Sequence, residues 1–455
     1  FVSKPMLTTD FQTCLNMATT NLGVVLFALP YSFRHVGVGL TMTMIVLQYF
    51  WTKYCSNCLI EATKSMDVKM KEGTDPYLKL MRDNFGLVGA RFLDIAYIIA
   101  LYGAGLSYQI SFGFSMADMP WGPNAHLLSD FRFWTILYLF IEIPLCLLRS
   151  LRSISFASLG SVIVMVLCCI VIIIYGAMNW GFSWDNAFWK VDNTIDVGKC
   201  FGLLSFGLAV NCLVPSSYVS MMHPERISPI VSISIIFALS LYVAMGLLGL
   251  LTFNKVEGGI DVFIMRNIPH QSPFYYTSSA VLCVMLILIT PIIVYPSSLT
   301  IDAWFTTGCG NGDDALLENE VVHTPEAEQA PQNPQTAQEN TQEQAGETVA
   351  VAMEEKAQEL KQATDHRTGV FITDFPGVAA RVLPLLIMTV LAYFWPRFGN
   401  VVSITGASAT SFVNFIFPTM IHFKLFRKEQ KCWAVVDIIL TVFGVFAAVV
   451  GTYMS

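Results

Sequence analysis

Apolar runs of about 20 residues, separated by short polar stretches, recur along this chain of 455 residues. A transmembrane helix needs about 20 apolar residues, so each run predicts one membrane span. The pattern therefore predicts an all-α polytopic membrane protein with about eleven transmembrane helices. The spans are expected near 10–33, 37–60, 88–115, 131–149, 154–178, 198–221, 228–253, 274–300, 375–396, 400–423 and 433–454.

The first predicted span is interrupted. Thr19, Thr20 and Asn21 are polar, Gly23 follows them, and Pro30 comes after an aliphatic run. Backbone that leaves the helix at membrane depth is tolerated only where it is buried in protein or lines a cavity. Transporters bind substrates and ions at such breaks. This segment is therefore the first candidate site, although packing glycines and kinking prolines are also common in membrane helices.

The sixth predicted span, with the sequence FGLLSFGLAVNCLVPSSY, is interrupted in a similar way by Gly207, Asn211 and Pro215. The two interrupted spans lie five spans apart, so they are predicted to enter the membrane from opposite sides. This arrangement is typical of an inverted repeat with a site at the midplane between two discontinuous helices. Free N–H groups at the breaks suit a carboxylate, and free carbonyls suit an ammonium group or a coupling cation.

The composition supports the membrane assignment and isolates one unusual segment. The chain is 54% hydrophobic and 13% charged, whereas soluble domains carry about 25% charged residues. Residues 306–370 hold thirteen Asp or Glu and three Lys or Arg, so this segment accounts for more than the whole net charge of -7. Its composition predicts a disordered acidic cytoplasmic insertion, with a short helix possible over 353–364. The insertion divides one transmembrane domain into helices 1–8 (residues 1–305) and helices 9–11 (residues 371–455).

Lys and Arg are concentrated in the loops after the second, fourth and tenth spans. Because cytoplasmic loops retain cations, the N-terminus is predicted to be cytoplasmic. A short interfacial helix is expected on the same face over 75–86. Asp94 and Asp437 lie near the cytoplasmic ends of their spans and are expected to reach the interface.

Other polar residues within the spans are candidates for ion coupling or substrate contact. Glu142 lies in the fourth span, and an intramembrane carboxyl group suggests a proton relay. The alternative is a structural pair with Arg149, Asp94 or nearby serines. Thr290, before Pro291, could provide a hydroxyl group to a cation. Gln109 and Tyr108, in the third span, could face the central site or form hydrogen bonds between helices.

The sequence provides no motif for an enzyme. The pair Cys55 and Cys58 has redox or metal spacing, but one such pair without a second pair or histidines is a weak signal. No phosphate-binding glycine loop, metal cluster or nucleophile–base pair is found in the sequence. Neither a cofactor nor a metal is expected, and nucleic acid is not an expected partner.

Several motifs together resemble the amino acid/auxin permease family. The first span has Thr19, Gly23 and Leu29-Pro30-Tyr31, and the fourth and fifth spans are joined by PLCLLRSLRSISFASLGS over 144–161. The sixth span has FGLAVNCLVPSSYVSMMHP over 206–224, and the segments 292–297 and 402–417 are similar to the eighth and tenth spans of the family. The similarity covers nearly the whole chain except 306–370. The chain departs from many members at Val25, where a second small residue is usual, and Asn21 and Val24 also look atypical.

The resemblance implies an eleven-helix, LeuT-like fold of two inverted five-helix repeats plus one helix. It implies secondary transport of amino acids, driven by protons or sodium, by alternating access. An amino acid sensor and a transporter of auxin-like or other small organic solutes are the alternatives. A plasma membrane or an endolysosomal or vacuolar membrane is expected. The substrate-binding residues are predicted to be Thr19, Thr20, Asn21, Gly23, Val24, Phe206, Gly207, Asn211 and Gln109, and the coupling-ion residues Thr290 and Glu142.

Overall fold

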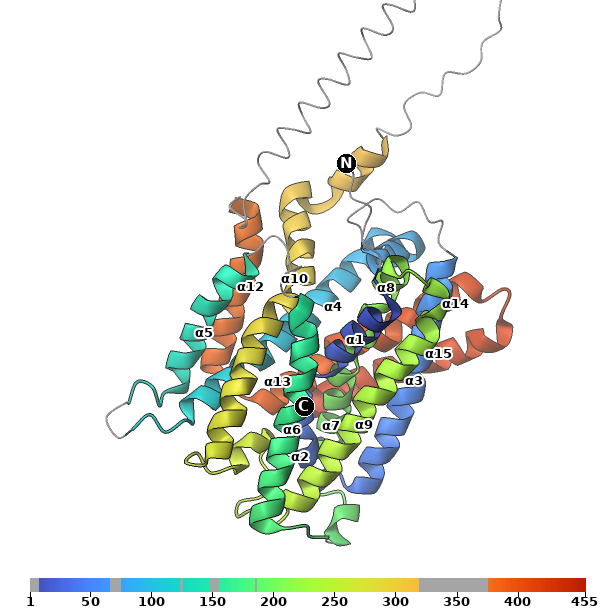
Figure 1. Ribbon diagram of the computed structural model, residues 1–455. Helices are drawn as coiled ribbons and strands as arrows, with labels where there is room; N and C mark the ends of the chain where they lie inside the picture. The colour runs from blue at the N-terminus through green and yellow to red at the C-terminus, as the bar shows by residue number, and fades with distance from the viewer. Residues whose placement is uncertain (1–7, 66–74, 123–125, 148–154, 185, 319–374) are drawn as a thin grey trace, which may run out of the picture.

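The computed structural model describes residues 8–65, 75–122, 126–147, 155–184, 186–318 and 375–455 (Figure 1). Eleven described helical segments correspond to the predicted spans. Nine of them are long and apolar enough to cross a membrane. The prediction of a helical polytopic membrane protein is confirmed. In chain order the spans are Asp10–His35 (α1, η1, α2), α3 (Val38–Lys64), α4 (Pro76–Ala117), α5 (Phe131–Cys146), α6 (Ser155–Trp180), Thr194–Ser220 (α7, η4, α8), α9 (Ile227–Phe253), α10 (Pro273–Glu318), α12 (Phe375–Phe394), Phe398–Phe426 (α13, η7, η8, α14) and α15 (Lys431–Met454).

The first span is discontinuous, as predicted. Helix α1 (Asp10–Asn21) begins at a capping box, in which Thr9 and Gln12 exchange side-chain and backbone hydrogen bonds. After Asn21 the backbone is extended through Leu22 and Gly23. A 3₁₀ segment, η1 (Val24–Ala28), follows, and α2 (Leu29–His35) resumes the helix with Pro30 in its first turn.

The sixth span is also discontinuous, as predicted. Helix α7 (Thr194–Gly207) ends at Gly207, and Leu208 leaves the helical conformation. The 3₁₀ segment η4 (Ala209–Cys212) follows, and α8 (Val214–Ser220) continues with Pro215 in its first turn.

The two interrupted spans lie side by side and run in opposite directions. At one end the Thr8 N–H donates to the Ser220 carbonyl (2.8 Å), and the Met222 N–H donates to the Thr8 carbonyl (3.1 Å). At the other end His35 Nδ1 lies 2.9 Å from Asp192 Oδ2, just before α7 begins. We call these the Thr8 end and the His35 end. The opposite directions agree with the sequence analysis, in which the second break lies five spans, an odd number, after the first. The repeat relation itself stays a prediction.

The tenth span contains two π-helical segments between α13 (Phe398–Thr405) and α14 (Phe417–Phe426). They are η7 (Gly406–Thr410) and η8 (Phe412–Ile416). A Cβ atom built at Gly406 would lie 1.9 Å from the Gly202 carbonyl oxygen, so the backbones of this span and α7 touch. π-Helical turns are frequent at functional sites, and here they face the interrupted sixth span.

The short helix expected over 75–86 forms, but it is joined to the third span. Asp75 caps it by accepting a hydrogen bond from the Tyr77 N–H (2.9 Å). At Gly86 the backbone has φ 68° and ψ -164°, which favours glycine and creates a kink within α4. The stretch 76–85 is therefore an angled extension of a membrane helix.

At the start of the acidic insertion, α10 continues through residues 306–318. The rest of the insertion, including the short helix expected over 353–364, lies outside the described residues, as do Arg149 and Arg152.

The expectation that Asp94 and Asp437 reach the interface is wrong. Their exposed fractions are 6% and 1%. Each carboxylate has a partner that allows burial, because buried charges require pairing. Asp94 lies 3.6 Å from Arg91, and Asp437 is hydrogen-bonded to Tyr54 and His422.

Candidate binding site

A cavity of about 70 Å³ lies where the two interrupted spans meet. From the first span it is lined by Thr20, Gly23 and Val25. From the sixth span it is lined by Phe206, Gly207 and their neighbours in η4. Four of the predicted substrate-binding residues, Thr20, Gly23, Phe206 and Gly207, are thus brought together around one cavity.

Other spans complete the wall. Tyr97 and Tyr108 reach the cavity from α4, Ile293 from α10, and Thr410 and Asn414 from the tenth span. Of these residues, only Tyr108 was expected from the sequence as one that could face the central site. They are distant from both breaks in the sequence, and only the packing of α4, α10 and the tenth span brings them together.

The remaining predicted residues of the breaks support the lining residues. Thr19 is buried, and its hydroxyl donates to the Leu15 carbonyl (2.9 Å). Asn21 and Val24 are fully buried in or next to the first break. Asn211 Nδ2 donates to the carbonyl of Asn414 (2.7 Å), so it holds a lining residue of the tenth span in place.

Gln109 lies in a different environment. Its Nε2 donates to the Thr135 carbonyl (3.0 Å) and to Thr389 Oγ1 (2.9 Å). These bonds join α4 to α5 and α12, which matches the alternative of a hydrogen bond between helices. Its assignment to the substrate stays a prediction, without support from the cavity lining.

The first break leaves main-chain donors available. Leu26 is the first residue of η1 whose N–H donates a hydrogen bond to a preceding carbonyl, that of Gly23 (3.2 Å). The N–H groups of Gly23, Val24 and Val25 precede it, and the first amides of any helical segment have no partner within that segment. A Cβ atom built at Gly23 would lie 3.2 Å from Tyr108 Oη, so a larger residue would crowd this hydroxyl group beside the break.

One tyrosine bridges the two breaks. The hydroxyl group of Tyr242, on α9, donates to the carbonyls of Asn21 and Gly207 (2.9 Å for the latter). These carbonyls end α1 and α7, where a helix carries partial negative charge. A Cβ atom built at Gly207 would lie 2.2 Å from Tyr242 Oη, so the contact requires glycine there. A buried tyrosine in an apolar span needs a hydrogen-bond partner for its hydroxyl group. The position of Tyr242 within an apolar span was the signal that the sequence offered for this role.

The described lining residues carry no formally charged side chain. A charged side chain of a ligand would therefore be buried without a counterion, at a cost of several kcal/mol or more. A zwitterion is different, because the dipoles of the main chain at the breaks can stabilise both of its charges.

The two coupling candidates lie close to one another, on neighbouring spans. The Thr290 hydroxyl is hydrogen-bonded to the hydroxyl of Tyr138 (2.6 Å). Glu142 follows Tyr138 by one turn on α5 and is fully buried. Its Oε2 lies 3.9 Å from Cys146 Sγ, while Oε1 has no hydrogen-bond partner among the described residues. The proposed pair with Arg149 lies outside the described residues.

The family comparison agrees with this geometry. Residues 7–455 match the family model of the transmembrane amino acid transporter proteins. The chain belongs to this family. The match includes both interrupted spans and every lining residue of the cavity, and it confirms the resemblance found in the motifs.

Three relatives match this chain over most of their own length. The chain is 23% identical over 463 residues to vacuolar amino acid transporter 7 of Saccharomyces cerevisiae, covering 90% of this chain and 88% of that protein. It is 23% identical to vacuolar amino acid transporter 6 of the same yeast, covering 92% and 90%. It is 22% identical to amino acid transporter ANT1 of Arabidopsis thaliana, covering 98% and 92%.

Proposed function

We propose that this chain is an ion-coupled secondary transporter of neutral amino acids. The observation that carries the proposal is the meeting of two broken, oppositely directed helices at an uncharged cavity, where Tyr242 joins their freed carbonyls. The family and the names of the relatives support amino acid transport. Those names also favour transport over sensing.

The amino acid's two charges bind at different parts of the main chain. Its carboxylate accepts hydrogen bonds from the free N–H groups that begin at Gly23. Its ammonium group lies toward the carbonyls that end α1 and α7, with the Thr20 hydroxyl nearby. The side chain of the substrate packs on the apolar wall that includes Val25 and Phe206. This arrangement selects against lysine, arginine, aspartate and glutamate as substrates.

Transport proceeds by alternating access through contacts at the two ends of the interrupted spans. At the Thr8 end, Asp10 contacts Arg226 (3.2 Å) and His223 (3.5 Å). At the His35 end, Tyr31 and His35 contact Asp196 and Asp192. Exposed ion pairs contribute little stability each, roughly 0–1 kcal/mol, so either set can open at small cost.

The coupling ion is a proton or sodium, with Glu142 and Thr290 as the candidate residues. The buried Glu142 carboxyl, with one oxygen free of described partners, favours a proton. The N-terminus, and with it the Thr8 end, faces the cytoplasm. The relatives named as vacuolar transporters favour a vacuolar membrane over the plasma membrane.

Uptake into proteoliposomes tests this function. Labelled alanine, leucine, lysine and glutamate are offered with an imposed proton gradient, a sodium gradient or neither. We expect gradient-driven uptake of alanine or leucine and little uptake of lysine or glutamate, with loss of proton-driven uptake in Glu142→Gln. Uptake of the charged amino acids alone, or equal uptake without any gradient, would contradict the proposal.

A further inference from the structure

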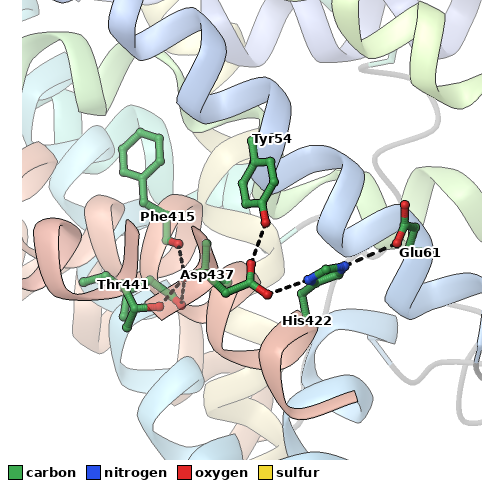
Figure 2. A network of polar contacts seen from close by, with 8 residues as sticks. Tyr54, Glu61, Phe415, His422, Asp437 and Thr441 are labelled. Carbon is green, nitrogen blue, oxygen red and sulfur yellow. Dashed lines mark hydrogen bonds and ion pairs between the residues drawn. The ribbon is translucent and has the colours of Figure 1, made fainter. Parts of the chain in front are cut away.

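A polar cluster lies apart from the cavity, between α3, α14 and α15 (Figure 2). His422 Nδ1 lies 2.7 Å from Asp437 Oδ2, and His422 Nε2 lies 3.3 Å from Glu61 Oε2. The Tyr54 hydroxyl donates to the other Asp437 oxygen (2.8 Å). The side chains of His422 and Asp437 are 5% and 1% exposed, whereas that of Glu61 is 47% exposed. The cluster thus extends from a buried carboxylate to an exposed one.

One shared proton would turn both contacts of His422 into hydrogen bonds. An ionised carboxylate only accepts hydrogen bonds, and a neutral imidazole has one donor nitrogen. Because both nitrogens of His422 face carboxylate oxygens, both contacts are hydrogen bonds only when one additional proton is present. That proton forms the second N–H bond of the ring and reduces the formal charge of the three groups from two negative charges to one.

No cationic side chain within the described contacts replaces that proton. Lys424, on the turn after His422, contacts the Asn84 carbonyl and lies over the ring of Phe85 on α4. Arg427 lies over the ring of Phe423. The other titratable groups near His422 are the phenol of Tyr54 and the thiol of Cys58, both on α3.

A divalent cation is the competing occupant. Cys58 Sγ, an Asp437 oxygen and a His422 nitrogen lie within 4.8 Å of one another, and zinc binds such atoms. However, both ring nitrogens of His422 already have carboxylate partners, one of them at 2.7 Å. A metal would have to displace this hydrogen bond, so the observed distances favour the proton.

The cluster is connected to the cavity through a single span. His422 lies on α14, which continues directly from the η8 segment that contains Val413 and Asn414. Both of these residues line the cavity. Their carbonyls accept hydrogen bonds from Tyr77 and Asn211, so the position of η8 affects both α4 and the second break.

We propose that Glu61, His422 and Asp437 form a proton-binding site whose occupancy sets the position of the tenth span at the substrate cavity. When the proton is bound, the imidazolium holds α14 against α3 and α15. When it leaves, two carboxylates face a neutral ring, and one of the two hydrogen bonds is lost. The proton site stands on its own geometry, and only its effect on transport rests on the proposed function.

The direct test is ¹⁵N NMR of histidine-labelled protein in lipid nanodiscs at neutral pH, which requires no transport. We expect one histidine with both ring nitrogens protonated, absent in His422→Gln and in Asp437→Asn. His126→Gln, which replaces an exposed histidine in a loop, is the matched control and should retain the signal. The wild-type spectrum alone is informative if a variant fails to fold. Absence of a doubly protonated histidine would overturn the proposal, as would stoichiometric Zn²⁺ binding that is lost in Cys58→Ser.

The effect on the cavity is tested by the pH dependence of uptake. Wild-type uptake should change over the pH range in which the His422 signal titrates, and His422→Gln should flatten that part of the profile. His126→Gln should retain the wild-type profile. An unchanged profile in His422→Gln, with the NMR signal gone, would overturn the coupling to the cavity. Failure of all uptake with the NMR signal intact would instead reject the proposed function.

Discussion

At the scale of single residues, the candidate site is lined by glycines and uncharged side chains. Gly23 and Gly207 each lie where a Cβ atom would press on a tyrosine hydroxyl, on Tyr108 and Tyr242 respectively. Both glycines were predicted from the sequence, because each is part of a local interruption in an apolar run. Tyr242 and Asn414 could not be assigned to the site in this way, because their role depends on long-range packing.

Val25 lines the cavity, and its side chain is fully buried. It stands at the position where the resemblance to the family implies a smaller residue. Val25→Ala should therefore admit larger neutral amino acids while retaining the main-chain contacts. Space for one additional methylene group changes the discrimination between two substrates by about 10-fold or more. We expect leucine or phenylalanine to gain about 10-fold relative to alanine in competition uptake assays.

Unchanged selectivity in a correctly folded Val25→Ala protein would show that the substrate does not contact this wall. Val46→Ala is the matched control, since Val46 is 50% exposed on the outer face of α3. This variant should retain the wild-type order of substrates.

At the scale of elements, every break in a membrane helix frees backbone groups that must find partners. Tyrosine hydroxyls on neighbouring helices meet this need. Tyr242 donates to the ends of α1 and α7, Tyr97 donates to Cys212 in η4 (2.6 Å), and Tyr77 donates to Val413 in η8 (2.6 Å). The neighbouring helices α4 and α9 therefore provide hydrogen-bond donors to the interrupted segments.

Tyr242→Phe tests this role of α9. The variant keeps the ring and removes the shared donor, so the carbonyls of Asn21 and Gly207 lose their partner. A lost buried hydrogen bond costs about 1–2 kcal/mol. We expect a lower thermal midpoint in a tryptophan-fluorescence or scanning calorimetry measurement, and substrate binding weaker by up to about 10-fold. Tyr453→Phe, at a side chain that is 90% exposed, is the control. Equal stability and affinity in both variants would show that the bridge is not required.

At the scale of the whole molecule, the span lengths and the two breaks could be predicted from short stretches of sequence. Bilayer thickness sets the length of each apolar run, and the need to hydrogen-bond every backbone group makes an interruption in such a run informative. The opposite directions of the interrupted spans could also be predicted, because the two spans lie five spans apart in the sequence. The burial of Asp437 could not be predicted, because its partners Tyr54 and His422 come from other spans. The same holds for the kink at Gly86, where an expected separate helix continues into the membrane.

The central claim is that an amino acid binds to main chain where the first and sixth spans break. The most direct measurement is equilibrium binding of labelled leucine to purified Gly23→Trp, compared with wild type and with Gly160→Trp. A Cβ atom at Gly160 would meet nothing within 4 Å, so that variant controls for a large side chain in a membrane helix. We predict that Gly23→Trp remains folded and loses binding, while Gly160→Trp binds as wild type does. Wild-type affinity in Gly23→Trp would contradict the account.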